Sequence, residues 1–273
     1  MSVDSQISNV GRLALISQQD RLFESDPEPV MASPRSLLKP LQVAALLRMS
    51  RSLTDEQVAM AVSSHNGEPT HLELIAELAD ATGVDLAAIP VQPHRPLIGE
   101  LGIDTRCGSS AKAANPCAGK HILAAHCTRL AGADYLEFGG LVELTCRQYI
   151  REACRISRDL TPVRDGCGFP TYALTISEMA TGLRSLLVSE ERHDVAVVRS
   201  LAAHPYLVGG GGRAVTNEVL SGGALFAKDG VGGLFAVAYF DGAVAVGGAV
   251  RDDQVTLGSA LQEARASARR LIA

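Results

Sequence analysis

Residues 224–250 read ALFAKDGVGGLFAVAYFDGAVAVGGAV, and glycine-rich turns divide this stretch into apolar runs at 224–227, 234–240 and 243–250. Short apolar runs separated by such turns predict an antiparallel β-meander. The apolar side chains of residues 257–272 recur at helical spacing and predict a closing amphipathic helix. The C-terminal part of the chain therefore predicts a β-sheet with a helix packed on it.

The N-terminal part predicts a hairpin that can join this sheet. Apolar runs at 13–16 and 22–23 flank a polar turn at 18–20. Between the two ends of the chain, apolar residues recur with the period of a helix. Helices are expected from Ser36 onward and near 55–62, 70–81, 119–131, 141–157, 177–188, 190–203 and 214–220.

This order of elements predicts an α+β fold. Strands at both ends and helices between them bring the terminal segments together in one antiparallel sheet, with the helices packed on it. We expect the strands within 11–24 and 223–250, a central helical region at about 36–220, and a single domain over residues 1–273. Residues 86–118 are rich in Pro, Gly and Ser and predict a long irregular connection.

The composition disfavours several classes of partner. The net charge is −5 and the basic residues are scattered, which argues against binding to nucleic acid or to an anionic membrane. No apolar run approaches the ~18 residues of a membrane-spanning helix, and the first twenty residues do not resemble an export signal. We expect a cytoplasmic protein that binds a small molecule or another protein, with its six cysteines as thiols.

Lysine is rare in this chain, which has four lysines against twenty-one arginines. A buried lysine can lose its proton near neutral pH, whereas arginine cannot, so the retained lysines point to chemistry. Three of them, Lys39, Lys120 and Lys228, lie in short polar motifs. The fourth, Lys112, lies in a Ser/Ala-rich loop and is expected to be a solvated charge.

Ser36 precedes Lys39 by three residues in the first turn of a predicted helix, so both side chains lie on one face. The helix N-terminus adds free amides and a positive field that can stabilise an oxyanion. A serine beside such a lysine is a nucleophile with its base. On its own, the pattern is more often a capping serine and a surface lysine.

Two further motifs accompany this pair. Ser64-His65-Asn66 matches Ser-x-Asn, and Lys228-Asp229-Gly230 matches Lys-x-Gly at the end of a predicted strand, in the order used by serine β-lactamases and penicillin-binding proteins. In such a site Ser36 attacks a carbonyl and Lys39 accepts its proton. Lys228 then holds Ser64 or passes a proton to the leaving amine.

Three arginines are candidates for a bidentate ion pair with a substrate carboxylate. They are Arg35, Arg106 and Arg213, and their positions favour Arg35, next to Ser36, and Arg213, after the glycine run 209–212. That run could bring backbone amides to a ligand, or it could be a flexible loop. His65 could orient a base or a substrate, or form hydrogen bonds only within its own loop.

Five segments in order carry a resemblance to a known family: 34–42 (PRSLLKPLQ), 63–68 (SSHNGE), 117–121 (CAGKH), 165–170 (DGCGFP) and 208–213 (VGGGGR). Together they resemble the successive motifs of the asparaginase II family, the rhizobial thermolabile type of L-asparaginase, which is distantly related to serine β-lactamases. The resemblance runs from about residue 12 to the end. The CAGKH and DGCG segments are its most distinctive parts.

The resemblance implies a β-lactamase-like fold and hydrolysis of L-asparagine to L-aspartate and ammonia through an acyl-enzyme. By position it implies two serine/lysine tandems, Ser36 with Lys39 and Ser64 with Lys228. The residues expected to bind substrate are Arg35, His65, Asn66, His121, Asp165 and Arg213.

The resemblance further implies a zinc site made of Cys117, Lys120 and Cys167, in a protein expected to be a homodimer. A lysine ligand must be deprotonated, and a dication supplies the energy for this. Zinc is expected to be supportive rather than catalytic, because a serine already provides the nucleophile. From the residues alone, Cys167 would be a small buried residue and Lys120 a solvated charge.

The chain departs from the family pattern in several places, and these departures leave the substrate open. Ala118 stands where the family usually has serine, Val10-Gly11-Arg12 replaces a common His-Arg pair, and the loop before Cys117 is short. The alternatives are an amidase or acyl transferase that acts on another small amide, or a catalytically silent protein that binds a ligand.

Overall fold

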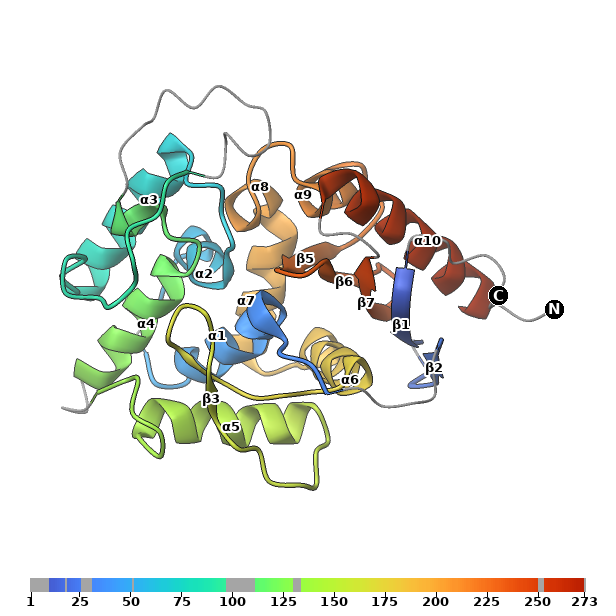
Figure 1. The fold of residues 1–273 in the computed structure, drawn as a ribbon, viewed down its shortest axis with the longest axis horizontal. Helices are drawn as coiled ribbons and strands as arrows, with labels where there is room; N and C mark the ends of the chain where they lie inside the picture. Colours follow the sequence, from blue (N-terminus) through green and yellow to red (C-terminus); the bar gives the residue numbers. More distant parts are fainter. Residues whose placement is uncertain are drawn as a thin grey trace.

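The computed structural model describes residues 10–17, 19–25, 31–50, 52–96, 111–129, 134–249 and 253–272. Its main sheet has five antiparallel strands in the order β2-β1-β7-β6-β5 (Figure 1). The strands are β1 (Val10–Ile16), β2 (Leu22–Glu24), β5 (Phe226–Gly230), β6 (Leu234–Ala238) and β7 (Val244–Ala249). The expected pairing of N- and C-terminal strands is confirmed, because β1 lies between β2 and β7.

The meander forms where the glycines predict its turns. Gly232 and Gly233 connect β5 to β6 with φ of 86° and 74°, and Gly242 connects β6 to β7 with φ of 87°. Only glycine adopts these left-handed angles at little cost. The turns therefore hold β5, β6 and β7 side by side, with Lys228 paired to Ala236 in the register.

Alternation along the strands gives the sheet two apolar faces. On one face, residues such as Phe235 and Val237 pack against α10 (Gln254–Ile272). On the other face, Ala236 and Val246 join a larger core shared with the helices. Figure 1 shows α10 along one side of the sheet and the helical region on the other.

Helices and short turns make up the region between the terminal strands. In chain order they are η2 (Arg35–Leu38), α1 (Lys39–Leu47), α2 (Asp55–Val62), α3 (Pro69–Thr82), η4 (Lys112–Ala114), α4 (Ala118–Arg129), α5 (Leu141–Ala153), α6 (Ile176–Val188), α7 (Arg192–Ala203), α8 (Pro205–Val208) and α9 (Ala214–Leu220). A two-stranded sheet of β3 (Val163–Arg164) and β4 (Pro170–Thr171) lies between α5 and α6. Among the described residues, no helix combines the length and apolarity needed to cross a membrane.

Helix α1 lies at the centre of this region, and all nine of its residues are buried. It packs against α2, α4, α5, α6 and α7, which accounts for an apolar surface on every side. Gly182 allows one of these contacts, since a Cβ there would lie 2.8 Å from Leu41 Cδ1. The first residue of this buried helix is Lys39.

The predicted helix beginning at Ser36 forms in two parts, the 3-10 turn η2 and then α1. Pro40 is the second residue of α1, where a missing N–H costs no helical hydrogen bond. Lys112 differs from the expectation of a solvated charge. It is only partly exposed, and its ammonium donates to the carbonyl oxygens of Ala87 and Ile89.

Candidate active site

The Lys39 amine bonds to three groups of the site. Its Nζ donates to the Ser63 carbonyl oxygen, to Ser64 Oγ at 3.2 Å and to the Pro116 carbonyl oxygen at 2.6 Å. Burial lowers the pKa of the Lys39 amine, and a neighbouring negative charge on Cys117 opposes this shift. Lys39 thus joins three segments of the chain around a buried amine.

Lys39 contacts Ser64 rather than Ser36. Ser36 lies in η2, is partly exposed, and accepts a hydrogen bond from the backbone N–H of Lys39. In the described part of the chain, Ser36 Oγ is not among the hydrogen-bond partners of the Lys39 amine. The structure therefore links the two predicted tandems through Lys39 and Ser64.

The Ser64 loop is held by the glycine run before α9. Asn66 Nδ2 donates to the Gly211 carbonyl oxygen and to Glu68 Oε1, both at 2.9 Å, and Glu68 Oε1 accepts from Gly211 N at 2.7 Å. Gly210 has a φ of 114°, and a Cβ there would lie 2.4 Å from Asn66 Nδ2. The glycine run is therefore a fitted support for Asn66 and Glu68.

Lys228 lies on β5, the edge strand that packs against η2. Its side chain is 1% exposed, and Nζ donates to the Asp229 carbonyl oxygen at 3.1 Å. Burial lowers the pKa of Lys228 to about 7; the Asp229 carboxylate opposes the shift, and Lys39 and Arg213 add to it. Lys228 is thus buried within electrostatic reach of Lys39, and its hydrogen bond goes to Asp229 rather than to Ser64.

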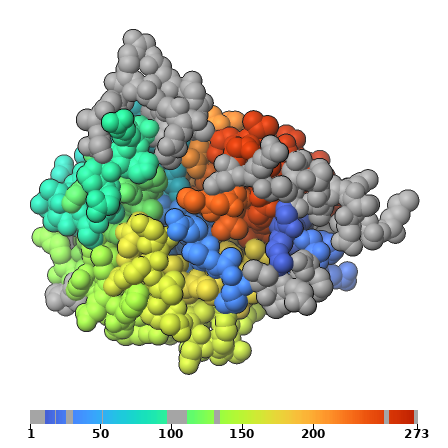
Figure 2. All heavy atoms as spheres, viewed as in Figure 1, coloured from blue at the N-terminus to red at the C-terminus, as the bar shows by residue number. Residues whose placement is uncertain are grey.

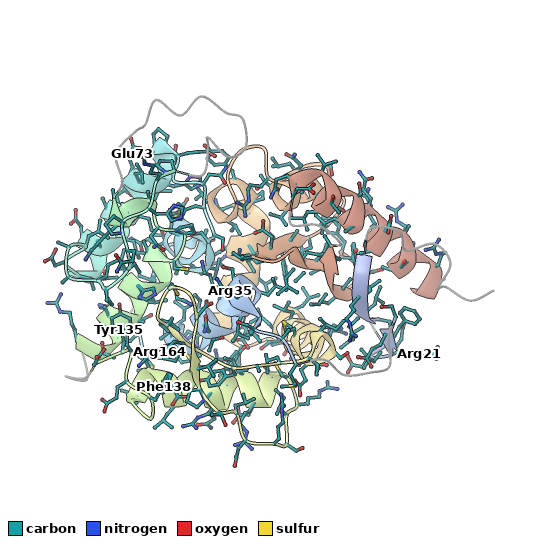
Figure 3. All side chains as sticks on the ribbon, in the orientation of Figure 1. Arg21, Arg35, Glu73, Tyr135, Phe138 and Arg164 are labelled. Atoms are coloured by element: carbon teal, nitrogen blue, oxygen red, sulfur yellow. The ribbon has the colours of Figure 1, made fainter. Side chains whose placement is uncertain are left out.

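Each of the two favoured arginines is paired with an acidic residue. Arg213 donates to Asp229 Oδ2 at 2.5 Å, and both side chains are largely buried. Arg35 lies 3.3 Å from Asp165 Oδ1, and its side chain is 36% exposed. Figure 3 places Arg35 where the helices meet the sheet, and in Figure 2 the blue segment that holds η2 reaches the surface beside the yellow segment.

Cys117 and Cys167 are brought together beside the two lysines. Their side chains are hydrogen-bonded, and this bond together with the charges of Lys39 and Lys120 lowers the pKa of the Cys117 thiol well below its usual value. The same bond and burial raise the pKa of Cys167. Cys167 Sγ also lies 4.0 Å from Asp165 Oδ2.

Lys120 is buried on the next turn of the chain after Cys117. Its Nζ donates to Gln42 Oε1 at 3.1 Å and lies 4.1 Å from the centre of the Phe169 ring. Gly119 permits this placement, because a Cβ there would lie 2.1 Å from the Met60 carbonyl oxygen. The close approach of α4 to α2 thus brings the Cys117 segment to Lys39.

The donor set fits zinc in its chemistry. Two adjacent thiols and a buried amine can supply soft sulfur ligands and a nitrogen ligand. Among the described residues, no group of three or more His, Cys, Asp or Glu side chains is arranged to hold a metal. A metal site here would therefore depend on the lysine as its third ligand, as the family resemblance implies.

The two histidines of the site are buried and differ in their surroundings. His65 Nδ1 accepts from Gly67 N at 3.0 Å, and its ring stacks on His71. His121 Nδ1 lies 2.9 Å from Tyr135 Oη. Burial lowers the pKa of both imidazoles well below the usual value, so both are neutral at neutral pH.

Sequence reasoning missed three polar residues that hold the others. Asp229 pairs with Arg213, Glu68 holds the Ser64 loop, and Gln42 accepts from Lys120. All three lie within segments quoted for their motifs, so their proximity to the lysines and serines in sequence was an available signal. Arg106 lies outside the described residues.

One comparison with known proteins identifies the family of the chain. The family model described as L-asparaginase II matches residues 9–265 of the 273. A search of curated proteins gave no match. The matched region contains every residue of the site described above, and the family indicates an amidohydrolase of the asparaginase type. The chain belongs to the L-asparaginase II family.

Proposed function

We propose that this protein hydrolyses L-asparagine to L-aspartate and ammonia through an acyl-enzyme on Ser36. The observation that carries the proposal is the hydrogen bond between Lys39 Nζ and Ser64 Oγ, 3.2 Å long, in a buried site one helical turn from Ser36. Amines whose pKa is lowered by burial are suited to accept a proton near neutral pH.

In the first step Ser36 Oγ attacks the carboxamide carbon, and its proton passes to the Lys39 amine. Ser36 is the proposed nucleophile because it is partly exposed at the first turn of a helix, where a substrate can reach it, whereas Ser64 is buried. Free amides at the start of the helix favour the negative charge that develops on the carbonyl oxygen.

In the second step the C–N bond breaks and the leaving nitrogen takes a proton. Ser64 Oγ donates this proton and recovers the one that Lys39 took from Ser36, so ammonia leaves, an ester remains on Ser36, and the amines of Lys39 and Lys228 are neutral. Water then attacks the ester, the same amines remove its proton, and aspartate is released with Ser36 restored.

The ion pair of Arg35 and Asp165 is suited to the α-carbon end of the substrate. A guanidinium binds a carboxylate in a bidentate manner, and a carboxylate accepts from an α-ammonium group. Arg35 directly precedes Ser36, so the two charges of an amino acid bound there would lie close to the nucleophile. This arrangement supports an amino-acid amide as substrate.

Zinc is part of the proposal as a supporting ion held by Cys117, Lys120 and Cys167. When bound, it would supply a fixed positive charge that keeps both thiols deprotonated and Lys120 neutral. The chain's own residues then have separate tasks, since Lys39 and Lys228 move protons while the thiols fix the start of α4. The homodimer also stays a proposal, and light scattering in solution tests it.

Ammonia release from L-asparagine tests the proposal. Ser36→Ala is expected to abolish turnover, and Ser221→Ala, which changes an exposed serine after α9, is expected to leave it unchanged. Acid quenching should trap an aspartyl ester on the peptide that contains Ser36. Full activity of Ser36→Ala, or strict preference for another amide or for an amine acceptor over water, contradicts the proposal.

A further inference from the structure

The two members of the second tandem, Ser64 and Lys228, lie on separate parts of the fold. Ser64 is in the loop after α2, and Lys228 is in the edge strand of the sheet. Both side chains are buried. If Ser64 and Lys228 are to act on one substrate, a contact must fix β5 relative to the loop that carries Ser64.

Asp229 contacts the groups that could provide this link. Successive residues of a strand point to opposite faces, so Asp229 and Lys228 leave β5 on different sides. Asp229 Oδ2 accepts from Arg213, and Asp229 Oδ1 lies 3.6 Å from Lys228 Nζ. The carboxylate is 5% exposed, so water screens these interactions little.

Arg213 connects this carboxylate to the Ser64 loop. It is the N-cap residue of α9 and directly follows the glycine run. Gly211 in that run bonds to Asn66 and Glu68, and Ser64 N donates to the Val208 carbonyl oxygen at 2.8 Å. Contacts therefore run without a break from Lys228 through Asp229 to the loop that carries Ser64.

Asp229 is the main negative charge near Lys228. Three cationic groups come from different elements, Lys228 on β5, Lys39 on α1 and Arg213 at the start of α9. The negative groups that act on Lys228 are Asp229 and the thiol of Cys117, and Asp229 has the larger influence. Without the carboxylate, buried like charges would face one another.

We infer that Asp229 is a positioning residue for the second tandem: its carboxylate ties Lys228 to Arg213 and so fixes β5 against the loop that presents Ser64. This inference rests on the proposed function for its catalytic meaning, but the tie between the three side chains can be measured without any activity. Asp229 contacts no substrate in this role and acts through Lys228 and Arg213.

The scarcity of lysine makes a direct test possible. Protein labelled with 13C at lysine Cε carries four side-chain NMR signals, one for each lysine. The signal missing from Lys228→Met identifies Lys228, and a pH titration of that signal follows its charge. The wild-type midpoint is expected near pH 7, because burial lowers the pKa of Lys228 to about 7.

Two variants should move the Lys228 midpoint in opposite directions. Asp229→Asn removes the attractive charge and is expected to lower the midpoint by about 1 to 3 pH units. Arg213→Gln removes a repulsive charge and leaves Asp229 to Lys228, so the midpoint rises. If Asp229→Asn does not fold, the rise of the Lys228 midpoint in Arg213→Gln still tests whether Asp229 links Lys228 to Arg213. Asp229→Glu keeps the charge and should restore much of the wild-type midpoint.

Glu218→Gln is the matched control. Glu218 is another buried carboxylate, within α9, and its Oε1 lies 3.4 Å from Nη1 of Arg265 on α10. Glu218→Gln should lower the free energy of unfolding, as Asp229→Asn does, but leave the Lys228 midpoint unchanged. An unchanged midpoint in both Asp229→Asn and Arg213→Gln overturns the inference, as does an equal shift in Glu218→Gln.

Activity separates this inference from the proposed function. If wild-type protein releases ammonia, Asp229→Asn should lower kcat by at least about tenfold and move the acid limb of its pH profile with the NMR midpoint. If wild-type protein releases none, the proposed function fails while the titrations still decide whether the tie exists. Normal kcat with an unmoved pH profile in Asp229→Asn would overturn the positioning role.

Discussion

Lys39 Nζ bonds to Ser64 Oγ at 3.2 Å, although the Ser-x-x-Lys spacing points to Ser36 as its partner. The lysine of one predicted tandem therefore contacts the serine of the other. One amine can take the proton of Ser36 on its own helix and exchange a proton with Ser64 on the neighbouring loop. Removing the Lys39 amine should slow both the attack of Ser36 and the departure of ammonia.

Lys39→Arg should reduce ammonia release by about 10²- to 10⁴-fold, the usual value of a positioned general base. Guanidinium keeps its proton at every accessible pH, so it cannot act as the base. Lys112→Arg is the matched control, because it makes the same change at a lysine that only holds the carbonyl oxygens of Ala87 and Ile89. Comparable activity in Lys39→Arg and wild type would exclude Lys39 as the base.

The pH dependence of unfolding should report Lys228. Burial lowers the pKa of Lys228 to about 7 in the folded protein from its usual value of 10.5, so between these pH values the unfolded chain binds more protons. Stability therefore gains a contribution as the pH rises from about 7 to about 10.5. Lys228→Met should flatten this rise in urea unfolding measured across the range. An equal slope in the variant would show that Lys228 stays charged when folded.

The same group sets the expected acid limb of activity. In the proposed hydrolysis of the ester, neutral Lys228 can accept the proton of the attacking water, so kcat for asparagine should rise with pH and level off above a midpoint near 7, the value to which burial lowers the pKa of Lys228. Kinetics in buffers of constant ionic strength measure this midpoint. A profile that stays flat from about pH 5.5 to about pH 8.5 would argue against an amine whose pKa is lowered from the value of ~10 for a free lysine.

Gly210→Ala should damage both the fold and the site. The backbone has a φ of 114°, and the new Cβ would lie 2.4 Å from Asn66 Nδ2. We expect a loss of about 2 to 4 kcal/mol in the free energy of unfolding, together with lower activity. Gly222→Ala is the control, since its φ is 71° but its surroundings are open. It should cost only about 1 to 2 kcal/mol and leave activity intact.

Metal analysis should find about one zinc ion per chain in protein purified without chelators. Cys117→Ser and Cys167→Ser should each lose that zinc, because both thiols belong to the proposed ligand set. Cys154→Ala changes a buried thiol beside Gly182 and should retain the metal. Equal zinc content in all of these variants would place the metal elsewhere.

Sequence patterns predicted the architecture because it depends on local periodicity. Glycines at 232, 233 and 242 mark the turns of the meander, and the apolar repeat from Leu37 to Leu47 marks a buried helix. The short strands β3 and β4 were not expected, since two residues each give no readable period. The motifs also named the lysines and thiols that the structure gathers.

The partners of those residues could not be predicted from spacing. Nothing in the sequence tells which serine Lys39 meets, because the answer depends on how the loop after α2 lies against α1. Asp229 and Glu68 were visible in their motifs, but their value comes from contacts with Arg213 and Gly211 across the fold. Long-range packing, rather than local propensity, decides these pairs.

All residues of helix α1 are buried, and its first residue is Lys39. Any substitution that loosens the packing around this helix will therefore also shift the Lys39 amine. Evolution therefore cannot tune the core and the chemistry of this enzyme independently.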